Sequence, residues 1–127
     1  MIRLARPDTK IVVTEPAGAS MLSGNAWAPH KIQGWTPDFV PQVLNKEVAH
    51  RIVPVTDVEA METARSLAKS EGIFCGISSG GTFAAARKVA EEAPAGAVIL
   101  AMLPDTAERY LSTPLFEGIN EGSDPEP

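Results

Sequence analysis

Apolar runs alternate along this chain with segments in which apolar residues recur at helical spacing. Residues 10–15, 51–55 and 98–103 are rich in β-branched and aliphatic residues and show no polar alternation. This pattern predicts three strands that are buried on both faces. Residues 58–70 and 82–92 place alanine and leucine on one face of a 3.6-residue period, which predicts two helices.

Capping residues and helix breakers set the expected boundaries. Asp57 is expected to cap the first helix, because a carboxylate can accept hydrogen bonds from the free amides of the first turn. Gly72 is expected to end that helix, and Pro54 indicates a short or edge strand. Residues 16–41 are predicted to form a loop long enough to be functional, followed by a short helix within residues 40–48.

Strands that alternate with helices predict an α/β fold with a mostly parallel sheet and flanking helices. Ligands bind such sheets at the carboxyl ends of the strands. Three segments occupy that position here: the loop after Glu15, residues 78–81 and the loop after Leu103. We expect residues 1–116 to form this domain and residues 117–127 to form an acidic flexible tail.

Composition excludes several classes of function. The 127 residues carry a net charge of −5 with no basic cluster, so a nucleic-acid surface is not expected. No apolar run approaches the roughly 20 residues of a membrane span, and no signal peptide is evident. The single cysteine favours a reducing, cytoplasmic compartment. His30 and His50 are too far apart in the sequence to indicate a metal site.

Residues 71–82, EGIFCGISSGGT, are the segment richest in candidate chemistry. Small residues between an apolar stretch and an alanine-rich helix predict a tight turn with free backbone amides, which can bind an anion or another hydrogen-bond acceptor. Alternatively, Ser78 or Ser79 only caps the helix. Cys75 is interpreted as a buried apolar side chain, because no histidine lies near it in sequence to activate a thiolate.

Four segments together carry a family resemblance. EGIFCGISSGG resembles the segment of cysteine synthases in which a serine meets the pyridine nitrogen of pyridoxal phosphate. KIVVTEP, HKIQG followed by FVP, and ERYLST resemble further segments of that family in the same order. The chain is therefore similar to the C-terminal part of a cysteine synthase (O-acetylserine sulfhydrylase), a pyridoxal-phosphate enzyme of fold-type II with a tryptophan synthase β-like large domain.

The resemblance implies that Ser78 binds the ring nitrogen of the cofactor. A serine hydroxyl is a neutral donor, so the ring need not hold a proton, which suits elimination and β-replacement better than transamination. Ser79 can equally be a turn or cap residue, and the segment after the third strand can equally be a simple turn. The other residues implied at the site are, for the cofactor, Gly76, Ser79, Pro104 and Asp105, and for the substrate, Gln33 and Gly34.

The activity that the resemblance implies is cysteine biosynthesis, in which sulfide replaces the acetate of the amino-acid substrate O-acetylserine. A related β-synthase acting on serine and homocysteine, or a serine or threonine dehydratase, is an alternative. Residues 35–38, Trp-Thr-Pro-Asp, replace a glycine-rich stretch of the family. Because of this departure, the resemblance does not predict whether this chain has the family's mobile gate or which substrate it uses. The family also implies a homodimer and a possible serine acetyltransferase partner.

The family holds its cofactor through a Schiff-base lysine in its N-terminal half, and no lysine here lies in a matching context. The five lysines are Lys10, Lys31, Lys46, Lys69 and Lys88. The glycine-rich phosphate loop is also unmatched. We therefore expect the isolated chain to be inactive and to self-associate through unpaired strand edges. A non-catalytic interaction module is the competing hypothesis. A dinucleotide-binding domain is disfavoured because no G-x-G-x-x-G follows a strand.

Overall fold

The computed structural model describes residues 1–119. Two strands, β1 (Val12–Pro16) and β2 (Arg51–Val55), form a parallel pair in register along their whole length. A parallel pair needs a long crossover connection, and residues 17–50 provide it. Two of the three predicted strands are therefore confirmed, and the bounds of β2 agree with the prediction.

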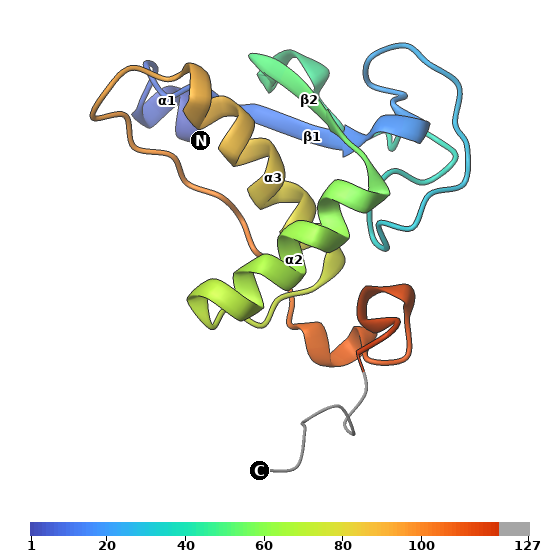
Figure 1. Cartoon of the computed structure of the whole chain (residues 1–127). Coiled ribbons are helices and arrows are strands. Elements are labelled where there is room, and N and C mark those ends of the chain that lie inside the picture. The colour runs from blue at the N-terminus through green and yellow to red at the C-terminus, as the bar shows by residue number, and fades with distance from the viewer. Residues whose placement is uncertain (120–127) are drawn as a thin grey trace.

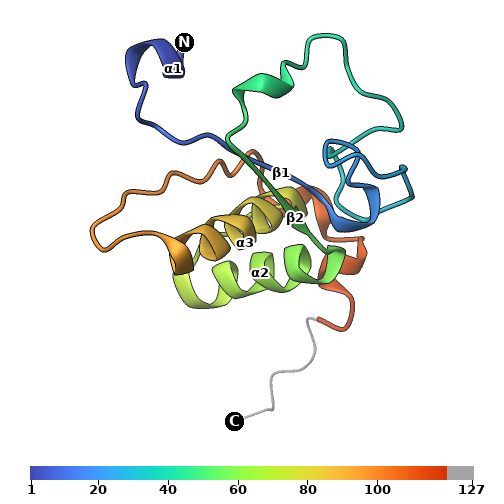
Figure 2. The ribbon, with the colours of Figure 1, turned by 90° about the horizontal axis from the view of Figure 1, so that it is seen from above.

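Two long helices follow the strands. Helix α2 (Asp57–Glu71) packs along helix α3 (Ile77–Glu92), and α3 contacts both strands. The two helices touch each other and cross, as Figure 1 shows, and the strands pass over them in the view of Figure 2. This arrangement confirms the predicted parallel α/β class. The buried hydrophobic core consists of Ile32, Val53, Val55, Ala60, Ala64, Leu67, Cys75, Ile77, Ala84, Ala85, Tyr110 and Leu115.

The start of α2 differs by one residue from the prediction. Thr56, rather than Asp57, is the N-cap: its hydroxyl accepts from the Glu59 amide at 3.1 Å, and the Glu59 carboxylate accepts from the Thr56 amide at 2.8 Å. This reciprocal capping box satisfies two free amides at once. Asp57 instead accepts from the Lys31 amide at 2.9 Å and ties the long crossover loop to α2. Gly72 ends α2 as predicted.

Helix α3 begins earlier than predicted, at Ile77 instead of Thr82. Gly80 allows α2 to approach closely, and this packing outweighs the low helix propensity of glycine. The helix predicted within residues 40–48 is wrong, because only one 3-10 turn, η2 (Lys46–Val48), forms there. The remaining short elements are α1 (Ile2–Ala5), η1 (Ala17–Ala19), η3 (Ala107–Tyr110) and η4 (Pro114–Phe116).

The third predicted strand, residues 98–103, is wrong. The segment runs extended but pairs with no strand of the described chain. A strand needs a neighbour to hydrogen-bond its backbone, and within residues 1–119 this segment has none.

The C-terminal turns are fastened to the helices. The Arg65 guanidinium donates to the carbonyls of Leu115 and Pro114, and the rings of Phe74 and Phe116 lie 5.6 Å apart. The expected tail extends beyond this anchor, and its residues 120–127 lie outside the described residues. In the part of the chain that the structure describes, no helix has the length and hydropathy needed to cross a membrane.

Candidate functional site

The first turn of α3 contains the serines that the sequence singled out. Gly76 is the N-cap and offers no side chain, so no side chain caps this helix. The amides of the first turn have no acceptor within the helix and lie at the positive end of its dipole. The turn is therefore suited to bind a hydrogen-bond acceptor.

The two serines of this turn differ in their contacts. Ser79 is fully buried, and its hydroxyl donates to the Asp105 carbonyl at 3.4 Å. Ser78 is only 5% exposed, yet within residues 1–119 its hydroxyl has no hydrogen-bond partner, although its carbonyl accepts from the Thr82 hydroxyl. Neither serine is the N-cap, so the capping alternative is wrong. The hydroxyl is not among the fully buried polar atoms without a partner, so it is open to a ligand. Ser78 is therefore the side chain here best placed to meet one.

Asp105 closes one side of the turn. Its carbonyl accepts from the Gly76 amide at 3.2 Å. Its carboxylate lies against the Gly76 α-carbon, where a methyl group would overlap both this carboxylate and the Tyr110 ring. The Tyr110 hydroxyl donates to one carboxylate oxygen, while Oδ1 is buried with no partner in the described chain. The hydrogen bond to Asp105, with burial second, raises the pKa of Tyr110 to about 12.

Trp35 closes a second side of the turn. Its ring lies where a β-carbon on Gly81 would approach within 2.7 Å. Trp35 thus brings the loop after β1 onto α3, as expected for a site at the carboxyl ends of strands.

The Trp35 loop is braced at the next residue. The Thr36 carbonyl accepts from the Trp27 indole at 3.0 Å and from the His30 Nε2 at 3.1 Å. Thr36 itself has φ +23°, the only positive φ at a non-glycine residue in residues 1–119. A β-branched residue rarely adopts this conformation. The loop is therefore held rigidly in a backbone conformation that suits glycine better.

The structure brings together four of the predicted site residues and leaves three apart. Gly76, Ser78, Ser79 and Asp105 meet at the first turn of α3. Pro104 adjoins this cluster but is exposed, and Gln33 and Gly34 are exposed on the loop that carries Trp35. In this chain the loop contacts α3 through Trp35, which lies in the stretch that departs from the family pattern.

Cys75 precedes the turn and behaves as a core residue. Its side chain is buried, and this burial raises the pKa of the thiol. A raised pKa lowers the fraction of thiolate, which is the nucleophilic form. The expectation that Cys75 is a buried apolar side chain is confirmed.

The lysine that lies on the same helix as this turn is engaged elsewhere. Lys88 lies ten residues after Ser78 on α3, roughly 15 Å along the helix axis. Its amine contacts Glu59 at 2.7 Å and donates to the Pro54 carbonyl at 3.2 Å. The hydrogen bond from Lys88 lowers the pKa of Glu59. Within residues 1–119, no lysine amine is hydrogen-bonded or ion-paired at the first turn of α3.

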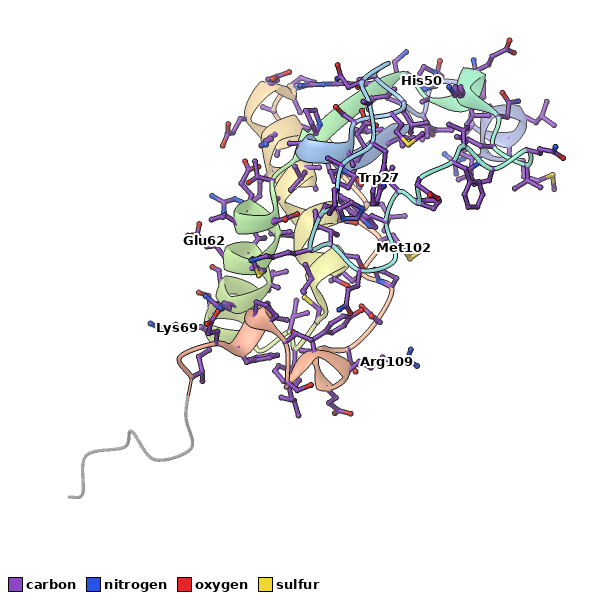
Figure 3. The ribbon with its side chains drawn as sticks, turned by 90° about the vertical axis from the view of Figure 1, so that its right-hand side faces the viewer. Trp27, His50, Glu62, Lys69, Met102 and Arg109 are labelled. Carbon is purple, nitrogen blue, oxygen red and sulfur yellow. The ribbon has the colours of Figure 1, made fainter. Side chains whose placement is uncertain are left out.

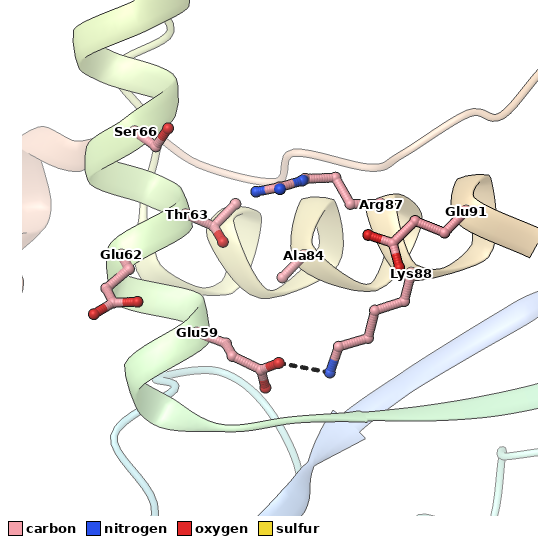
Figure 4. A pocket seen from close by; sticks show the side chains of 8 residues that line it. All are labelled: Glu59, Glu62, Thr63, Ser66, Ala84, Arg87, Lys88 and Glu91. Atoms are coloured by element: carbon pink, nitrogen blue, oxygen red, sulfur yellow. Dashed lines mark ion pairs between the residues drawn. The ribbon is translucent and has the colours of Figure 1, made fainter.

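The Glu59–Lys88 pair crosses an open groove of about 310 Å³ between α2 and α3 (Figure 4). The groove is lined mainly by charged and hydroxyl side chains. It shares no residue with the Ser78 turn.

Sequence reasoning missed one buried carboxylate. Glu15, at the end of β1, is fully buried and accepts from the Leu22 amide at 2.8 Å and from the Ser23 amide at 3.2 Å, as well as from the Ser23 hydroxyl. It shapes the loop that leaves the strand. The sequence did contain a signal for this site, because Glu15 is an acidic residue at the carboxyl end of an otherwise apolar strand. The described residues contain no cluster of His, Cys, Asp or Glu suited to a metal ion.

Comparisons with known proteins identify similar sequences and structures. Residues 1–105 match the family described as pyridoxal-phosphate dependent enzyme. The chain is 55% identical over 124 residues to O-ureido-L-serine synthase of Streptomyces lavendulae, covering 98% of this chain and 38% of that protein. It is 44% identical over 110 residues to cysteine synthase of Staphylococcus aureus, covering 87% of this chain and 36% of that protein.

A crystal structure of O-ureido-L-serine synthase, 55% identical, matches 98% of this chain with a TM-score of 0.94 and covers 39% of its own chain. The chain thus spans less than two fifths of the length of these relatives.

Proposed function

This chain belongs to the pyridoxal-phosphate-dependent enzymes, and we propose that it forms part of an enzyme that replaces the β-substituent of an activated L-serine. Relatives in this family include cysteine synthase and O-ureido-L-serine synthase. Cysteine carries sulfur on its β-carbon, and O-ureido-L-serine carries an oxygen-linked ureido group on the same carbon. Either product follows from one reaction type, in which a nucleophile displaces a leaving group such as the acetate of O-acetylserine.

The observation that carries the proposal is the unpartnered hydroxyl of Ser78. Ser78 is only 5% exposed, but its hydroxyl is not among the fully buried atoms without a partner. The hydroxyl lies in a helix turn with free amides and makes no hydrogen bond within residues 1–119. A pyridine nitrogen is an acceptor of the right kind for it. When bound, the cofactor supplies the electron sink that allows the leaving group to depart. Ser78 holds the ring nitrogen through a neutral hydrogen bond, and the contact between Ser79 and Asp105 keeps the turn in place.

The described residues fit only the pyridine edge of the cofactor. Lys88 is paired with Glu59, and the other four lysines are exposed. The turn also carries no cationic side chain for a phosphate dianion. We therefore infer that the amine and the phosphate contacts come from polypeptide outside residues 1–119. The 127-residue chain alone is then inactive, and residues 1–116 are an incomplete part of a larger domain.

One observation favours a nucleophile larger than sulfide. The identity to O-ureido-L-serine synthase is 55%, against 44% for cysteine synthase. On this reading the natural nucleophile is an N-hydroxyurea, and cysteine formation from sulfide is the alternative. A non-catalytic interaction module remains the competing class of function.

A hybrid enzyme tests these proposals. This chain replaces the matched segment of the Streptomyces lavendulae protein, and the hybrid is assayed with O-acetylserine plus either sulfide or N-hydroxyurea. We expect product formation by the hybrid and none by the isolated chain. Ser78→Ala should lower the rate about fivefold, since a lost hydrogen bond is worth roughly 1 kcal/mol, and should shift the absorbance of the bound cofactor.

Ser66→Ala is the matched control, because Ser66 is an exposed serine of α2. It should change neither the rate nor the spectrum. A hybrid whose rate and spectrum are unaffected by Ser78→Ala would contradict the assigned role of Ser78. A folded hybrid that releases no product with either nucleophile would favour the non-catalytic module.

A further inference from the structure

Trp35 covers one side of the helix turn that carries Ser78. A β-carbon on Gly81 would lie 2.7 Å from Cη2 of the Trp35 indole, and 3.2 and 3.3 Å from two further ring atoms. Gly81 follows Ser78 by three residues, so the two are neighbours on the same face of α3. Because a Cα–Cβ bond in a helix tilts toward the N-terminus, the ring lies on the Ser78 side of Gly81.

The chain's own contacts fix the Trp35 ring in this position. The Trp35 amide donates to the carbonyl of Ile32 at 3.2 Å, and the Ile32 side chain is fully buried in the core. At the next residue, the Thr36 carbonyl accepts from His30 and, at 3.0 Å, from the indole of Trp27, which is labelled in Figure 3. The half-buried Trp35 ring also packs against the hydrophobic core. The ring is therefore a fixed wall of the turn.

Other sides of the turn are occupied by the protein itself. Gly80 is pressed against α2. Ser79 donates to the Asp105 carbonyl at 3.4 Å. The hydroxyl of Ser78 is the side-chain donor of this turn that makes no hydrogen bond within residues 1–119. A ligand that accepts a hydrogen bond from Ser78 must therefore lie beside the Trp35 ring.

We propose that Trp35 is a positioning residue that covers the hydrogen bond between Ser78 and the pyridine nitrogen of the cofactor. This inference rests on the proposed function, because it takes the cofactor as the ligand of Ser78. A hydrogen bond between neutral groups is weak in water, which competes for both partners, and is stronger where water is excluded. Apolar side chains around a central contact strengthen it in this way without a polar contact of their own. Trp35 thus acts through Ser78 and supplies no reacting group.

The hybrid with the Streptomyces lavendulae enzyme tests this role through its affinity for the cofactor. The dissociation constant is measured by absorbance titration of the cofactor-free hybrid with pyridoxal phosphate. Trp35→Ala should weaken binding at least about fivefold, because water then competes for the hydrogen bond of Ser78. In a Ser78→Ala background, which has no such hydrogen bond, the same change should weaken binding less than about twofold.

Three further variants support the comparison. Trp35→Phe keeps an aromatic ring over the turn and should bind within about twofold of the parent hybrid. Trp35→Leu keeps an apolar contact with a smaller side chain, and it replaces Trp35→Ala if circular dichroism shows that the alanine variant does not fold. It should again weaken binding only where Ser78 is present. Val43→Ala alters a residue that is 95% exposed elsewhere in the crossover loop and should leave the dissociation constant unchanged.

Three outcomes would overturn the proposal. The first is equal weakening in the Ser78 and Ser78→Ala backgrounds, since Trp35 would then support only the fold. The second is unchanged binding in both Trp35→Ala and Trp35→Leu. The third is a parent hybrid that does not bind pyridoxal phosphate. Binding is measured here instead of turnover, so the result on Trp35 is separate from whether the hybrid releases product, which tests the proposed reaction.

Discussion

The Tyr110 hydroxyl donates a hydrogen bond to the carboxylate of Asp105, and that carboxylate lies directly against the α-carbon of Gly76. Three segments meet in this contact: the start of α3, the end of the extended segment and the turn η3. Tyr110 thereby ties the turn η3 to the start of α3. The same contact gives the chain a property that can be measured directly.

Tyr110 should ionise at unusually high pH. The hydrogen bond to Asp105 raises its pKa from the ordinary 10 to about 12, because the folded chain favours the neutral phenol. The stabilisation is therefore complete below pH 10 and is lost as the pH rises through about 12. Tyr110 is the only tyrosine, so ultraviolet difference absorbance reports it alone. An ionisation midpoint near pH 10, measured while circular dichroism shows that the chain is still folded, would contradict this expectation.

Removing the Tyr110 hydroxyl should destabilise the chain. Tyr110→Phe leaves the half-buried Asp105 carboxylate without its hydrogen bond, at a cost of about 1–3 kcal/mol in the free energy of unfolding. In the Asp105→Asn background the same change should cost less, since the unpaired group is no longer charged. A double-mutant cycle by urea denaturation measures this coupling, and additive effects would show that the two side chains do not interact.

Gly80 should not tolerate a side chain. A β-carbon there would overlap the Ala60 carbonyl oxygen and lie 2.8 Å from the Ala64 β-carbon. Gly80→Ala must therefore separate α2 from α3, at a cost of about 2–3 kcal/mol in unfolding free energy. Gly18→Ala is the control, because no atom lies within 4 Å of its added methyl group. Equal urea midpoints for the two variants would refute the close approach of the helices.

Glu15 should be essential to the loop that follows β1. Glu15→Ala removes the acceptor of two amides and a hydroxyl in a fully buried position. We expect a loss of about 3 kcal/mol in unfolding free energy and faster amide exchange at Leu22 and Ser23. Glu62→Ala, at an exposed position of α2, should be nearly neutral. Unchanged exchange at both amides would show that they do not depend on Glu15.

Replacing Thr36 by glycine should stabilise the chain. The backbone of Thr36 has φ +23°, which costs a β-branched residue energy that glycine does not lose. Thr36→Gly is expected to raise the unfolding free energy by about 1 kcal/mol. Thr9→Gly, at a loop position without a positive φ, should instead lower it slightly. If Thr36→Gly is the more destabilising of the two, the backbone at Thr36 is not strained.

Local patterns predicted the elements that are complete within the chain. Strand β2 and the body of α2 follow from β-branched runs and helical periodicity, and both were found where expected. The cap of α2 was missed although Thr56 and Glu59 carry the spacing of a capping box. Asp57 is also a residue type that commonly caps a helix, so the sequence alone does not decide between Thr56 and Asp57. The reciprocal hydrogen bonds of Thr56 and Glu59, seen in the structure, identify Thr56 as the cap.

Contacts between distant segments could not be predicted in the same way. Residues 98–103 have a strand pattern, but a strand also needs a partner, and the pattern is silent about which segment provides one. The family resemblance pointed to Ser78 and Asp105, but it carried no information on the Tyr110 contact or on the packing of Trp35 against Gly81. Both depend on how the crossover loop and the C-terminal turns fold back onto α3.

The first turn of α3 is enclosed on three sides: Asp105 and Tyr110 lie against Gly76, Ala60 against Gly80 and Trp35 against Gly81. None of these glycines can acquire a side chain during evolution unless its neighbour shrinks or shifts at the same time. We therefore expect positions 35 and 81, and separately positions 60 and 80, to covary among homologous sequences. The sequence of the turn that bears Ser78 should consequently change more slowly during evolution than the sequence of the exposed face of the same helix.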